Sequence, residues 1–171
     1  MKSHRLMLLA VLLALSAGAF AQSEAQKSFN NLKALAGTWE GQVTTVPTEA
    51  AVEGQTIRVT LRVTSMGNAL MHEASISGRP DDPITMLYLD GDRLLLTHYC
   101  DAGNRPRMLG KISPDGKSVD FEFLDVAGST QYGHMHHAVF TTIDANHHIE
   151  DWTFMQGDKP IHAHFDLQRT K

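Results

Sequence analysis

From Thr38 onward the chain is a succession of short segments in which apolar and polar residues alternate, separated by turn residues. A period of two is typical of strands with one buried face, and no further helical pattern interrupts the series. The sequence therefore predicts about ten antiparallel strands. Their expected ranges are 38–46, 55–65, 69–77, 84–89, 93–100, 106–112, 118–125, 134–143, 148–155 and 160–169.

A sheet of this many hairpin-linked strands closes most readily into an up-and-down barrel, because closure removes exposed edges. A sandwich of two sheets is the alternative. Before the strands, Phe29, Leu32 and Leu35 recur at a spacing of three and Gly37 follows, which predicts a short amphipathic helix over 24–36. The predicted fold class is all-β, a roughly ten-stranded antiparallel barrel with a short N-terminal helix as its lid or plug.

Turn residues predict which side chains share a face of the sheet. Two-residue turns are expected at Gly67-Asn68, Asp115-Gly116 and Gly157-Asp158. The last of these directs His162 and His164 outward. The pairs that the three turns predict are Val63 with His72, Ile112 with Val119, Met108 with Phe123, and Trp152 with Ala163.

The first 21 residues are typical of an export signal. Lys2 and Arg5 precede an apolar stretch, and Ala19-Phe20-Ala21 matches an A-x-A cleavage site. We therefore expect residues 1–21 to be a signal peptide, residues 22–171 to be a single lipocalin-like barrel domain, and the mature protein to be periplasmic or secreted.

Charge and composition limit the partners of this domain. The net charge of the chain is −4, and loss of Lys2 and Arg5 with the signal would make it more acidic, which argues against nucleic acid. No later apolar run approaches the roughly 20 residues of a spanning helix, and Gln22 offers no lipidation thiol, so no stable membrane anchor is expected. The single cysteine, Cys100, excludes an intrachain disulfide. Nothing in the sequence indicates an oligomeric state.

Four short motifs carry a resemblance. The segment 35–41 reads L-A-G-T-W-E-G, and THYC-x-x-GN-x-PRM at 97–108, GHMH at 133–136 and E-x-W at 150–152 follow it. With a G-x-W signature entering its first strand, the chain resembles the calycin superfamily of lipocalins, fatty-acid-binding proteins and nitrobindin-like barrels. It is most similar to secreted bacterial barrels without a settled activity. The resemblance implies a barrel with a ligand cavity and implies no reaction.

The predicted inner wall is mostly apolar, with a few polar exceptions that are candidates for binding a ligand. An apolar cavity with a few convergent polar groups is the usual anatomy of a small-molecule site. Arg107 is expected near the barrel mouth, either as surface charge or as a clamp for a carboxylate. For His136 the alternative is that a one-residue shift turns His137 inward. The candidate ligand-binding residues are His72, His98, Cys100, Arg107, His136, Glu150 and Trp152.

Histidines two apart on a strand can share a metal with a ligand from a neighbouring strand. His134, His136 and Glu150 are the candidate metal ligands on this basis. The resemblance to nitrobindin-like barrels implies a haem-ligating histidine near the end of the last strand, where His162 and His164 lie, although both are predicted to face outward. Non-covalent haem or a divalent metal is thus the cofactor expectation, and covalent haem is excluded because C-x-x-C-H is absent.

These observations favour an exported barrel that binds a small hydrophobic molecule with a polar end, lipid-like or haem-like, in a cavity bordered by Trp152 and His98. A histidine-metal or Cys-His enzyme acting in the same cavity is the second hypothesis, and a solidly packed structural barrel is the third. Motifs of serine hydrolases, nucleotide-binding loops and zincins are absent from the sequence.

Overall fold

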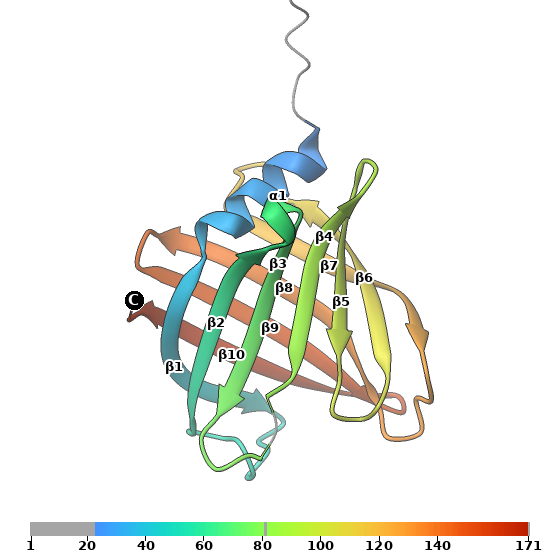
Figure 1. Cartoon of the computed structure of the whole chain (residues 1–171). Helices are drawn as coiled ribbons and strands as arrows, with labels where there is room; N and C mark the ends of the chain where they lie inside the picture. The colour runs from blue at the N-terminus through green and yellow to red at the C-terminus, as the bar shows by residue number, and fades with distance from the viewer. Residues whose placement is uncertain (1–22, 81, 171) are drawn as a thin grey trace, which may run out of the picture.

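The structure is a computed structural model that describes residues 23–80 and 82–170. The predicted signal peptide lies outside this part. The described chain forms one α-helix, a short 3₁₀ turn and ten strands (Figure 1). The elements are α1 (Glu24–Ala34), β1 (Gly37–Val46), β2 (Thr56–Thr64), η1 (Ser65–Gly67), β3 (Ala69–Ile76), β4 (Ile84–Asp90), β5 (Arg93–Tyr99), β6 (Arg105–Ile112), β7 (Ser118–Ala127), β8 (His134–Asp144), β9 (His147–Gln156) and β10 (Lys159–Arg169).

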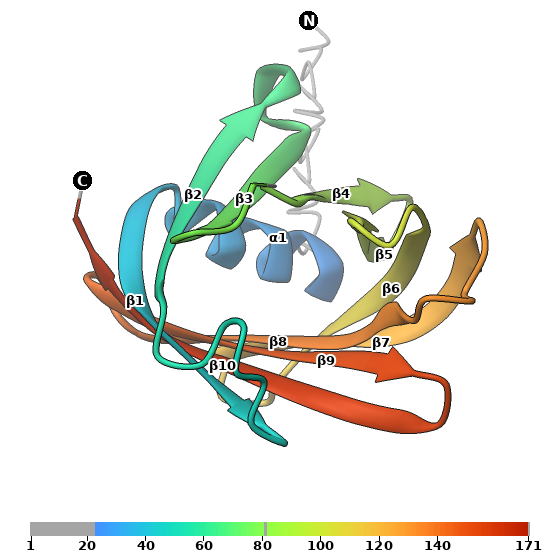
Figure 2. The same ribbon diagram turned by 90° about the horizontal axis from the view of Figure 1, so that it is seen from below.

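The ten strands form a closed antiparallel barrel in the order β1-β10-β9-β8-β7-β6-β5-β4-β3-β2. Closure occurs at β1, where Trp39 pairs with Val59 of β2 on one side and with Arg169 of β10 on the other. The predicted all-β barrel with a short N-terminal helix is confirmed. Figure 2 shows the wall encircling α1 when the molecule is viewed along the barrel from below.

Two of the three predicted turn registers are confirmed. Ile112 pairs with Val119 around Asp115-Gly116, and Trp152 pairs with Ala163 around Gly157-Asp158. The prediction at Gly67-Asn68 is wrong by two residues, because His72 pairs with Leu61. A 3₁₀ turn, in which Ser65 and Met66 have φ values of 52° and 54°, lengthens this connection. A shift of two keeps the same face inward, so His72 is still buried, at 2% exposure.

Helix α1 closes one end of the barrel (Figure 1). The side chain of Ser23 accepts a hydrogen bond from the backbone N–H of Gln26, which caps the helix, and Phe29 and Leu32 are buried in the barrel core. The helix ends two residues earlier than predicted. Among the described residues, no helix has the length and apolarity to cross a bilayer.

Trp39 joins this plug to the barrel wall. Its indole Nε1 donates to the backbone oxygen of Leu35 at 2.9 Å, directly after the helix. The guanidinium of Arg169 lies over the ring, 4.0 Å from its centroid, and donates to the backbone oxygen of Ala36. The helix end, the first strand and the last strand are therefore fixed together at the closed end, which leaves the opposite end for access to the interior.

Candidate functional site

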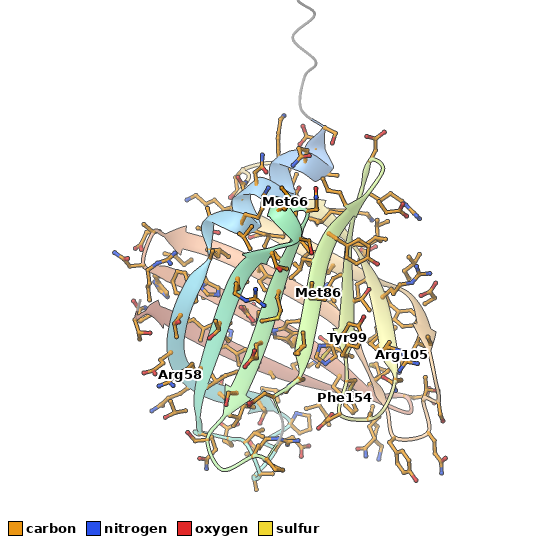
Figure 3. The ribbon with its side chains drawn as sticks, in the orientation of Figure 1. Arg58, Met66, Met86, Tyr99, Arg105 and Phe154 are labelled. Atoms are coloured by element: carbon orange, nitrogen blue, oxygen red, sulfur yellow. The ribbon has the colours of Figure 1, made fainter. Side chains whose placement is uncertain are left out.

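A cavity of about 340 Å³ lies inside the barrel at the end away from α1. Its position follows from its lining, which includes Glu49 and Val52 of the β1–β2 connection and Pro83 before β4. Phe154 lies toward this lower end in Figure 3. The residues that line the cavity are Val43, Thr45, Glu49, Ala51, Val52, Ile57, His72, Ala74, Ile76, Arg79, Pro83, His98, Cys100, Asp101, Met135, Trp152, Phe154, Ile161, Ala163 and Phe165.

The cavity exists partly because short side chains stand where larger ones would fill the interior. Ala74 and Ala163 line it from β3 and β10. Gly41 and Ala138, the other small inward residues, do not line it. Gly41 instead allows β1 to approach β10 closely, because a Cβ there would lie 2.1 Å from the backbone oxygen of Asp166 on β10. The expected cavity bordered by both Trp152 and His98 is confirmed.

Glu150 is the centre of a buried hydrogen-bond network beside this cavity. Its carboxylate is fully buried and accepts bonds from His72 Nε2 at 2.9 Å, His148 Nε2 at 3.0 Å and Trp152 Nε1 at 3.0 Å. The donors come from β3 and β9, on separate parts of the wall. The network therefore fixes the orientation of two rings that line the cavity, His72 and Trp152.

The electrostatics of the network favour an ionised Glu150. Burial by itself raises the pKa of this carboxyl group, but the interactions with His72 and His148 outweigh burial and leave the pKa below its ordinary value. The Nδ1 atoms of His72 and His148 are buried and have no partner among the described residues. Each of these imidazoles is thus hydrogen-bonded through Nε2 only.

His98 is the second buried histidine on the cavity wall. Its Nδ1 forms a 2.8 Å hydrogen bond with Thr85 Oγ1, and its ring lies 5.6 Å from that of Trp152. Burial, together with the nearby His72, lowers the pKa of His98 to about 4. The ring is therefore neutral at pH 7, and no described residue bonds its Nε2.

Cys100 lines the cavity at the end of β5 but has no feature of an activated nucleophile. Its Sγ lies 3.6 Å from Asp101 Oδ1. Burial raises the pKa of the thiol, and the adjacent carboxylate acts in the same direction. Since thiolates are the reactive form, this environment disfavours Cys-His chemistry.

The structure does not place His136 on the cavity wall; Met135 lines it instead. The pairing of β8 with β9 shifts between Met135 and His137, so an extra residue is accommodated there. His136 stacks on Phe123 at 4.6 Å and contacts His134. His137, the alternative, bonds to Asp120 and is also outside the cavity.

The expected metal site at His134, His136 and Glu150 is not assembled. Glu150 is bonded to His72, His148 and Trp152. His134 and His136 contact each other instead. In residues 23–80 and 82–170, no group of three or more His, Cys, Asp or Glu side chains is arranged to hold a metal ion.

Arg107, expected either as surface charge or as a carboxylate clamp, does not line the cavity. Its side chain is exposed and bonds to Asp125 on the neighbouring strand, with Nε at 2.8 Å from Oδ1. The guanidinium that does border the cavity belongs to Arg79, which donates to Asp101 Oδ2 at 2.8 Å. These two residues link the β3–β4 and β5–β6 connections at the cavity mouth.

The histidines implied by the nitrobindin resemblance do not fit a haem inside this barrel. His162 and His164 are exposed on the outer face and bond to Thr153 and Asp151. Between them, Ala163 faces the cavity. Their predicted outward orientation is confirmed.

Two residues of the buried networks were missing from the sequence-based candidates. His148 shares the inward face of β9 with Glu150 and Trp152, so alternation alone would have found it. Thr85 pairs with His98 across a two-residue turn at Gly91-Asp92, and that pairing depends on a turn whose register the sequence left uncertain.

The fold and the cavity together define a ten-stranded barrel closed by a helix at one end and hollow at the other. Rv2717c from M. tuberculosis shares this fold, with a TM-score of 0.61 and 13% identity over 84% of this chain and 98% of that one. A protein of unknown function from the DUF3598 family of Nostoc punctiforme has a TM-score of 0.55 and 12% identity, over 81% of this chain. The chain spans about half of that protein's length, 49%. No family model and no curated protein matches the sequence.

Proposed function

We propose that this barrel binds a small, largely apolar molecule with one polar end, with the apolar body in the cavity and the polar end at His98. The observation that carries the proposal is the cavity itself, about 340 Å³ of space enclosed by a mostly apolar wall. This size lies at the lower end of the roughly 300–1,000 Å³ typical of ligand pockets. The ligand is accordingly smaller than most lipids.

Apolar contact supplies most of the expected affinity. Each 100 Å² of ligand surface removed from water contributes about 2.5 kcal/mol before the cost of immobilising the ligand. Aromatic residues that border the space, including Trp152, Phe154 and Phe165, offer large contact areas. Because Glu150 holds Trp152 by a hydrogen bond, part of this wall is preorganised.

The same proposal includes export to the periplasm or the medium and a relationship to calycins. The signal-like residues 1–21 support export. The G-x-W motif, with Trp39 packed between the helix end and Arg169, supports the relationship. The metal and Cys-His enzyme hypotheses lack comparable support, because Cys100 has a raised pKa and no metal-holding cluster exists among the described residues.

Calorimetric titration with a series of straight-chain alcohols tests the proposal. We expect saturable binding to the mature protein and its loss in Ala163→Phe, which fills the cavity from β10. His162→Phe is the matched control, because the adjacent side chain is exposed and points away from the cavity. Binding that survives Ala163→Phe, or the absence of binding across the series, would contradict the proposal.

A further inference from the structure

We infer that the polar end of the ligand is an uncharged hydrogen-bonding group, such as a hydroxyl, carbonyl or amide, and not a carboxylate or an ammonium group. This inference rests on the proposed function and narrows its ligand class. The inference depends on two observations: which hydrogen-bonding atoms line the cavity, and which charged side chains there are already paired.

His98 offers a nitrogen that can bond a neutral group of either polarity. Its Nδ1 is engaged by Thr85 Oγ1, and both residues are almost fully buried, at 6% and 0% exposure. A threonine hydroxyl can donate to a neutral imidazole or accept from it. The His98 Nε2 can therefore accept from a ligand hydroxyl or donate to a ligand carbonyl, according to the tautomer.

A ligand carboxylate would find no uncommitted cation in the lining. The only guanidinium there among the described residues, that of Arg79, is bonded to Asp101 at the mouth, and no lysine lines the space. The carboxylates of Glu49 and Asp101 border the same cavity. Burying an anion without a partner costs more free energy than one hydrogen bond returns. Of the two histidines that line the space, His98 is neutral at pH 7, with a pKa of about 4, and His72 is bonded to the Glu150 carboxylate.

An ammonium group placed beside His98, at the inner end of the cavity, is disfavoured for a related reason. The buried carboxylate nearest the histidines is that of Glu150, and three donors already occupy it, from His72, His148 and Trp152. A cation at the inner end would have to displace one of these bonds. A neutral group requires no rearrangement of the network.

The test compares four straight-chain probes with the same number of carbon atoms at pH 7: 1-octanol, octanamide, octanoate and octylammonium. We expect the alcohol and the amide to bind, and the two charged probes to bind at least about tenfold more weakly. Octanoate binding equal to that of 1-octanol, and lost in Arg79→Gln, would overturn the inference and leave the proposed function intact. Failure of all four probes to bind would instead contradict the proposed function.

The contribution of His98 is tested in a second pair of variants. His98→Phe leaves the buried Thr85 hydroxyl without its partner, so the double variant Thr85→Val/His98→Phe removes both groups together. We expect the double variant to stay folded and to bind 1-octanol about fivefold more weakly. Unchanged discrimination between 1-octanol and octanoate in the double variant would show that His98 does not select the head group, and would overturn this part of the inference.

Discussion

At the scale of single residues, the barrel interior is organised around a buried charge, Glu150, which has three hydrogen-bond donors and no contact with water. Removing one partner of such a network is costly, because the remaining groups stay buried without compensation. Glu150→Gln keeps the shape and removes the charge. We expect it to lower the free energy of unfolding by about 2–4 kcal/mol in urea titrations.

Glu122→Gln is the matched control for this substitution. Glu122 is exposed and bonds to Lys111 on the outer face at 3.0 Å. Exposed pairs of this kind contribute little, so the expected change is within about 0.5 kcal/mol. Equal stabilities for Glu150→Gln and Glu122→Gln would show that the buried network does not stabilise the fold.

His98 gives a residue-scale prediction about pH. Its pKa falls from 6.5 to about 4 on folding, so the unfolded chain binds more protons between these values and stability decreases as pH falls through them. Between pH 7 and pH 5 this contribution amounts to about 2 kcal/mol. Urea titrations at both pH values should show a smaller loss of stability in Thr85→Val/His98→Phe than in the unsubstituted protein; an identical loss in both would contradict the assignment.

At the scale of elements, α1 is held mainly by its buried face. Phe29 and Leu32 are each 2% exposed and belong to the barrel core. Phe29→Ala should therefore lower the free energy of unfolding by about 3–4 kcal/mol, while Asn30→Ala on the exposed side should change it little. If both variants unfold at the same urea concentration as the unsubstituted protein, the helix does not stabilise the barrel.

Strands and their inward faces could be predicted from the sequence because alternation depends only on residue type and position. What could not be predicted were local departures from regular pairing. Positive φ values at Ser65 and Met66 moved the β2–β3 register by two, and neither residue type favours that conformation. In β8 an extra residue moved His136 off the cavity wall, and a sequence pattern does not reveal bulges.

For the candidate site too, the inward-facing residues could be predicted from the sequence and the contacts between strands could not. His72, His98 and Trp152 were predicted to lie inward because each belongs to an alternating row, and the structure brings all three to the cavity. For Arg107 the sequence left surface charge and a carboxylate clamp open, because its partner Asp125 lies on the neighbouring strand and only the pairing of the two strands brings them together. The hydrogen bonds between inward residues depend on how several strands pair. The alternation of residues along one strand does not give this pairing.

At the scale of the whole molecule, the two ends of the barrel differ. Helix α1 covers one end (Figures 1 and 2), where Phe29 and Trp39 belong to the core. The cavity at the other end is bordered by loops and by the Arg79–Asp101 pair. A ligand that binds only the folded protein stabilises it in proportion to the logarithm of its concentration. Saturating 1-octanol should therefore raise the Tm of the mature protein and leave that of Ala163→Phe unchanged, as differential scanning calorimetry can measure.

The most direct measurement of the central claim is a set of intermolecular nuclear Overhauser effects from bound 1-octanol to the protein's methyl groups. If the ligand occupies the cavity, the alkyl chain should give contacts to Ala74, Ala163 and Met135. It should give none to Leu32 on the buried face of α1. Contacts confined to outward-facing methyl groups such as that of Thr153, with none to the three cavity residues, would contradict the claim that this barrel binds its ligand inside.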